Sequence, residues 1–104
     1  MEQGEALELP GLVGCQEGAV DSRTLAKRDA GTVTLFAFDT GQALSGHTAP
    51  FDALVHVLAG EAEVVLGGTP HRVGEGQAIL MPAHVPHAVK APQRFKMLLV
   101  LVRG

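Results

Sequence analysis

The sequence predicts an all-β fold of two packed antiparallel sheets. Glycine or proline interrupts the chain every eight to twelve residues, and short β-rich apolar runs lie between these breaks, a spacing typical of sandwiches and barrels. No stretch combines a helical apolar stripe with a capping residue at its start and a glycine at its end, so little or no helix is expected. A length of 104 residues fits one domain with a single hydrophobic core.

Eight strands are expected between the breaks, and a Gly-Gly pair joins two of them. Gly67 and Gly68 supply the positive φ angles that a tight primed hairpin turn requires. Residues 1–20 mix acids, glycines and short apolar pairs, which indicates an N-terminal arm with room for one short strand, and residues 21–104 form the single barrel domain. The expected strands are Ser22–Lys27, Thr32–Asp39, Leu54–Leu58, Ala62–Leu66, Thr69–Val73, Ala78–Met81, His87–Lys90 and Arg94–Val102.

The last expected strand, Arg94–Val102, is apolar on both of its faces. A strand with two apolar faces is buried on both sides, within a sandwich or at a subunit contact. In so small a protein we expect a homodimer to bury the second face. Cover by the N-terminal arm is the alternative.

Composition excludes several classes of partner. The net charge is −3 and the lysines and arginines are scattered, so no basic stripe is available for nucleic acid. The longest apolar run, Met97–Val102, is too short to cross a bilayer, and no membrane partner is expected. Cys15 is the single cysteine and the start of the chain does not resemble a secretory signal, so a reducing, cytoplasmic location is expected.

Two motifs resemble those of the cupins. The resemblance is to small cupins of the conserved-barrel cupin 2 type. The first runs G-x5-H-x-A from Gly41 and closes at Gly60; the second runs G-x5-P-x-H-x2-H from Gly76 to His87. The resemblance covers about residues 30–102. It implies a jelly-roll barrel of two packed sheets with a cavity at one mouth.

The resemblance also implies a metal site, and here the first motif is degenerate. In the family, two histidines and a glutamate of the first motif and one histidine of the second bind a divalent metal. His47 matches the first of these ligands and His87 the last. Ala49 occupies the second histidine position and Ala53 the glutamate position, so half of the ligand set is absent.

Two other residues, Asp52 and His84, are candidates to complete a site around the two histidines. Asp52 follows a proline-containing turn, where strand parity does not decide its direction. His84 stands where the family has glycine, so a left-handed backbone conformation is the favoured explanation for it, and contact with a ligand or metal is the alternative. His47 is expected in the turn before the strand that contains His56. If His47 points into the barrel, the alternation of side chains along a strand directs His56 outward. We therefore expect His56 in a second layer or at the dimer interface.

Such a site would take Fe, Mn, Ni, Zn or Cu, but two imidazoles alone are a poor divalent site. The residues therefore favour a pocket without a functional metal. Small side chains would enlarge this pocket where the ligands are missing. The expected lining is apolar: Ala49, Ala53, Val55, Val57, Met81 and Val89.

Three functions fit this pattern. The sequence favours binding of a small molecule in the barrel mouth, with His47 and His87 as polar anchors. The alternative is a metal-dependent enzyme, of the oxygenase or isomerase type, with a reduced ligand set on the same two histidines. In the third, the histidines are hydrogen-bonded core groups of a structural protein. The fold is common to all three and does not discriminate between them.

Overall fold

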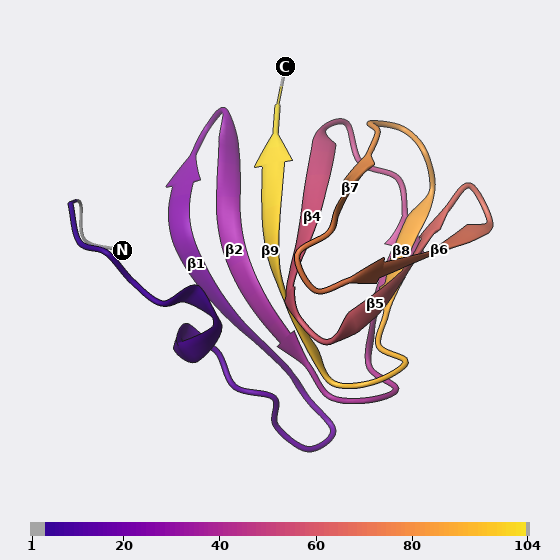
Figure 1. The fold of residues 1–104 in the computed structure, drawn as a ribbon. Coiled ribbons are helices and arrows are strands. Elements are labelled where there is room, and N and C mark those ends of the chain that lie inside the picture. Colours follow the sequence, from indigo (N-terminus) through magenta and orange to yellow (C-terminus); the bar gives the residue numbers. More distant parts are fainter. Residues whose placement is uncertain (1–3, 104) are drawn as a thin grey trace.

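The protein is a jelly roll in which two antiparallel sheets face each other across one core (Figure 1). The structure is a computed structural model that describes residues 4–103, and the side chains of all of these except residues 45–47. The larger sheet has the strand order β1-β2-β9-β4-β7 and the smaller one β3-β8-β5-β6. The strands are β1 (Val20–Arg28), β2 (Gly31–Phe38), β3 (Ala43–His47), β4 (Asp52–Ala59), β5 (Glu61–Leu66), β6 (Thr69–Gly74), β7 (Ala78–Met81), β8 (His87–Lys90) and β9 (Phe95–Val102).

The all-β prediction is confirmed, and each expected strand is found with ends within two residues of those predicted. Gly67 and Gly68 have φ angles of 55° and 85°, which is the conformation that the β5–β6 hairpin required of them. Ahead of β1, the described part of the arm contains a short 3-10 helix, η1 (Leu9–Leu12), where the sequence had allowed for a short strand. Within residues 4–103 no helix is long and apolar enough to span a bilayer.

Strand β3 was not predicted from the sequence. The sequence placed His47 in a turn, whereas the structure has it as the last residue of β3. β3 pairs with β8 through a register shift between Leu44 and His47, so that the backbone of His47 lies opposite that of His87. A short, irregular strand with a bulge carries no regular alternation from which sequence could identify it.

The core lies between the sheets because alternate residues of each strand point inward. On β4 the inward residues Ala53, Val55 and Val57 are all buried. At the closed end of the barrel, the rings of Phe38 and Phe95 stack with centroids 4.5 Å apart and planes 9° from parallel.

The N-terminal arm covers part of the outer face of the larger sheet. Leu35 and Ala37 of β2 are fully buried there, in a second apolar cluster with Val13 of the arm. Lys96, on the same outer face of β9, donates to the carbonyl oxygen of Pro10 at 2.6 Å. Cover by the N-terminal arm was the alternative to a homodimer for burying the second face of β9. The arm therefore covers one part of this face.

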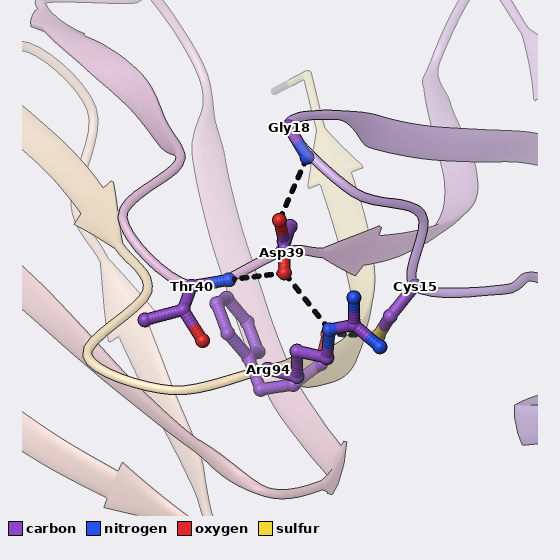
Figure 2. A network of polar contacts seen from close by, with 6 residues as sticks. Cys15, Gly18, Asp39, Thr40 and Arg94 are labelled. Atoms are coloured by element: carbon purple, nitrogen blue, oxygen red, sulfur yellow. Dashed lines mark hydrogen bonds and ion pairs between the residues drawn. The ribbon is translucent and has the colours of Figure 1, made fainter.

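The arm is fixed to the barrel by the carboxylate of Asp39, at the end of β2 (Figure 2). Its Oδ2 accepts from the Gly18 amide at 2.7 Å, and its Oδ1 accepts from the Thr40 amide at 2.9 Å and from Arg94 Nε at 2.8 Å. Three segments distant in sequence meet at this side chain. The backbone hydrogen bond from Gly18, and next the hydrogen bond from Arg94, lower the pKa of the Asp39 carboxyl.

This lowered pKa predicts an acid-dependent contribution to stability. The contribution is present above the ordinary carboxyl pKa of about 3.9 and is lost as pH falls through the lower pKa of the folded state. Asp39→Asn should therefore lower the thermal midpoint by a few degrees at neutral pH, and the difference from wild type should shrink below about pH 4. Thermal unfolding followed by circular dichroism over this pH range measures it; a difference independent of pH would contradict the assignment.

Candidate functional site

A small pocket opens between the sheets at one mouth of the barrel. Its volume is about 110 Å³. Both sheets contribute to its wall, which is aliphatic and aromatic except for one imidazole. The lining residues are Leu44, Ala49, Phe51, Ala53, Met81, His87, Val89, Leu99 and Leu101.

His87 is the polar residue of this lining. It begins β8 and is half-buried. Its Nδ1 lies 3.3 Å from the carbonyl oxygen of Val85. A carbonyl oxygen can only accept, so Nδ1 is the donor in this contact. The contact orients the ring.

The small residues that replace the family's ligands form the pocket's wall. Ala49 and Ala53 are 8% and 2% exposed, and both line the cavity. Met81, paired with Ala53 on the neighbouring strand β7, and Val89 of β8 line it as well.

The other two residues expected in the lining lie elsewhere in the interior. Val55 and Val57 point inward from β4 as predicted, but both are fully buried in the packed core and do not line the pocket. Sequence parity gave the direction of their side chains. It did not give their depth, which depends on where the smaller sheet closes over β4.

His47 can be placed only by its backbone. Its side chain lies outside the described residues, so its expected roles as ligand and polar anchor stay predictions. The register nevertheless brings the last residue of β3 directly opposite His87, so the two motif histidines share one position on adjacent strands.

Two hydrogen bonds fix the pocket's rim. The amide of His84 donates to the carbonyl oxygen of Ala49 at 2.8 Å, and the amide of Ala83 donates to Oδ1 of Asp52 at 2.8 Å. These bonds join the β7–β8 loop to the β3–β4 connection, through Ala49, and to the start of β4, through Asp52. Asp52 thus has a partner on the loop and does not line the pocket.

His84 has a φ of 65°, which confirms the left-handed backbone predicted for this turn. Its side chain is exposed and does not line the pocket. The structure therefore gives His84 a backbone role at the rim.

His56 lies on the opposite face of β4 from the pocket. Its neighbours Val55 and Val57 point into the core, whereas His56 is half-exposed on the outer face, paired with Leu98 of β9. This position agrees with the outward direction that strand alternation predicted for the His56 side chain.

The described side chains do not fit a bound metal. Among them, no three His, Cys, Asp or Glu residues gather closely enough to hold an ion. At the pocket they supply one imidazole, from His87, and His47 would raise the number of imidazoles to two. Catalytic zinc and non-haem iron normally have three protein ligands, and alanine at positions 49 and 53 cannot provide the third.

Four lining residues are absent from the predicted set. Leu44 lies on the unpredicted strand β3, and Phe51 lies in the turn before β4. Leu99 and Leu101 lie on the inward face of β9. Their spacing of two residues was a usable signal that they share one face. For Phe51 the sequence held no such signal, because turn residues have no regular direction.

A jelly roll with a ligand-sized cavity at one mouth defines a class of small barrel proteins. The profile of the cupin domain family matches residues 34–102, and the chain belongs to this family.

Solved structures agree with this membership. A conserved protein of unknown function from Streptococcus pyogenes is 40% identical, with a TM-score of 0.95, over 100% of this chain and 91% of that one. A cupin superfamily protein from Desulfitobacterium hafniense DCB-2 is 30% identical, with a TM-score of 0.92, over 100% of this chain and 95% of that one.

One curated relative has an assigned activity. It is the dimethylsulfoniopropionate lyase DddQ of Ruegeria pomeroyi, 41% identical over 59 residues. The match covers 56% of this chain and 29% of the lyase, so the chain corresponds to less than a third of that relative's length.

Proposed function

We propose that the protein binds a small, largely apolar molecule in the pocket at the barrel mouth, with His87 and His47 as polar anchors. The observation that carries this proposal is the lining, which is apolar apart from His87. Concave sites with apolar walls and a few convergent polar groups are the usual form of small-molecule sites.

The pocket's size and chemistry narrow the class of ligand. An apolar cavity of roughly 150 Å³ in another protein holds benzene, and this pocket has a volume of about 110 Å³. A ligand of about one six-membered ring is therefore the largest we expect to fit without movement of the wall. Burying a charge among aliphatic side chains is costly, so we expect an uncharged body with one hydroxyl or similar polar group.

A second candidate function is a lyase of the DddQ type, favoured by the 41% identity over 59 residues. Dimethylsulfoniopropionate carries a sulfonium cation and a carboxylate. The lining offers no carboxylate to the cation, which is why apolar binding is our first proposal. The two candidates make different predictions for the same set of probes.

The first test uses phenol, benzene and dimethylsulfoniopropionate as probes of the wild-type protein. The chain has no tryptophan or tyrosine, so phenol fluorescence can be followed with little protein background, and calorimetry serves for the other two. Ala53→Leu fills the pocket and should weaken phenol binding at least tenfold. Ala43→Leu, at the exposed start of β3 and away from this lining, is the matched control and should bind like wild type.

A second variant separates polar from apolar contributions. His87→Phe keeps a ring but removes the hydrogen-bonding nitrogens, so phenol should bind up to about tenfold more weakly while benzene binding changes little. Failure of phenol and benzene to bind wild type, or equal binding by Ala53→Leu, would overturn the proposal.

Metal analysis of untagged protein tests the enzyme alternative. Stoichiometric metal that disappears in both His47→Ala and His87→Ala, together with turnover of dimethylsulfoniopropionate, would favour the lyase.

A further inference from the structure

The pocket's mouth is bordered by one large side chain that no strand carries. The other large residues of the described lining stand on β3, β7, β8 and β9, where strand pairing holds them. Phe51 lies in the turn before β4 and is half-buried. Its ring is therefore the part of the described wall that can move with the least disturbance of either sheet.

The backbone on both sides of this ring is fixed. Ala49 and Asp52 each take part in one of the two rim hydrogen bonds to the β7–β8 loop, both 2.8 Å long. Between them, Pro50 has its φ angle locked by its own ring. Movement at this position is therefore rotation of the Phe51 side chain and not displacement of the turn.

The end of β9 brings a cation to the same place. Ala53 pairs with Leu101, and both line the pocket. The start of β4 and the end of β9 lie side by side at the mouth (Figure 1). Two residues further toward the mouth, Phe51 and Arg103 continue the inward sides of these two segments.

Arg103 lies across the face of the Phe51 ring. Its guanidinium carbon is 5.2 Å from the ring centroid, within the range of about 6 Å over which a cation is attracted to an aromatic face. The amide of Arg103 donates to the carbonyl oxygen of Ala30 at 2.8 Å, which fixes the backbone from which the side chain reaches. Arg103 is exposed and does not line the pocket, so the ring has the cavity as one neighbour and the guanidinium as another.

We propose that the Phe51 ring is the gate of the pocket and that Arg103 is the positioning residue that holds the ring across the mouth. The inference rests on the proposed function, since a gate matters only for a pocket that takes a ligand. To open, the ring rotates away from the guanidinium and uncovers the wall beneath it, which includes Ala53. Closure then encloses a bound ligand and limits its size.

Thiol accessibility in the full chain tests the gate without any ligand. Cys15→Ser removes the single natural thiol, and Ala53→Cys then places a thiol in the pocket wall. Its rate of reaction with methyl methanethiosulfonate follows the fraction of time that the pocket is open. Phe51→Ala should raise this rate about tenfold or more, because no ring then has to rotate aside.

Val57→Cys is the matched control for the position of the thiol. Val57 is fully buried on the same strand and does not line the pocket. Its replacement thiol should react slowly, at a rate that Phe51→Ala changes little. Circular dichroism confirms that each variant is folded.

Two variants of Arg103 test its part. Arg103→Gln removes the cation and should raise the reaction rate of the Ala53→Cys thiol roughly twofold to fivefold, the effect expected for an exposed cation–π contact. Arg103→Lys keeps a positive charge and should react at close to the wild-type rate. Equal rates in Arg103→Gln and Arg103→Lys would overturn the role of Arg103.

Two other results would overturn the gate itself. One is an unchanged rate for the Ala53→Cys thiol in Phe51→Ala. The other is equal acceleration of the Ala53→Cys and Val57→Cys thiols, which would show loosening of the whole core. Because no ligand takes part, these results are distinct from a failure of phenol and benzene to bind, which overturns the proposed function.

Discussion

Gly60→Ala is expected to destabilise the protein by about 2–5 kcal/mol, from a left-handed backbone and an overpacked contact together. Gly60 joins β4 to β5 with a φ of +77°. A β-carbon there would meet the carbonyl oxygen of Arg94 and would lie 2.9 Å from Cβ of Phe95. Both neighbours belong to the start of β9 or the residue before it, and neither can move without disturbing the centre of the larger sheet.

Gly68→Ala is the matched control for this prediction. Gly68 has a φ of +85°, and a β-carbon at this position would have no atom within 4 Å other than those of its chain neighbours. Gly68→Ala should therefore lower the free energy of unfolding only by the cost of a left-handed alanine, about 1–2 kcal/mol. Urea unfolding followed by circular dichroism measures both variants. Equal losses in the two would show that the contact with β9 contributes nothing.

Phe95→Ala is expected to cost about 3–5 kcal/mol, the usual range for removing a buried phenylalanine. Its side chain is 1% exposed and stacks on Phe38, which is 0% exposed. Removal leaves a cavity in the main hydrophobic core, to which both rings belong. A loss of this size is a large fraction of the about 5–15 kcal/mol that stabilises a typical domain.

The stacking itself can be measured with Phe38→Ala and the double variant. Beyond the area that each ring buries, a stacked pair contributes about 0.5–1.5 kcal/mol, which a double-mutant cycle reports as non-additivity. Phe51→Ala, half-buried at the pocket's rim, is the control and should cost less than either core variant. Additive losses for Phe38→Ala and Phe95→Ala would contradict a specific ring contact.

The fold was predictable because its signals are local. Gly67 and Gly68 identify a turn by backbone chemistry alone, and alternate burial on β4 follows from the inward direction of Ala53 and its neighbours at a spacing of two. β3 was missed for the same reason, because its pairing with β8 contains a register shift that no local pattern reports.

The site was predictable only in part because it depends on pairings between distant segments. The motif spacing located Ala49, Ala53 and His87 in the pocket, but the Val85 carbonyl that orients His87 follows from the conformation of one loop. The hydrogen bond between Asp52 and Ala83 joins residues 31 apart in sequence. Sequence parity could leave Asp52 open as a ligand, whereas its actual partner is a backbone amide that has no sequence signature.

Strand β9 has a consequence for how this protein can diversify. Its residues Leu99 and Leu101 line the pocket, while Leu98 and Val100 lie on the outer face of the same sheet. Substitutions at odd-numbered positions therefore alter the cavity, and those at even-numbered positions alter the exterior. Selection can thus change the cavity and the surface chemistry in separate steps along one eight-residue strand.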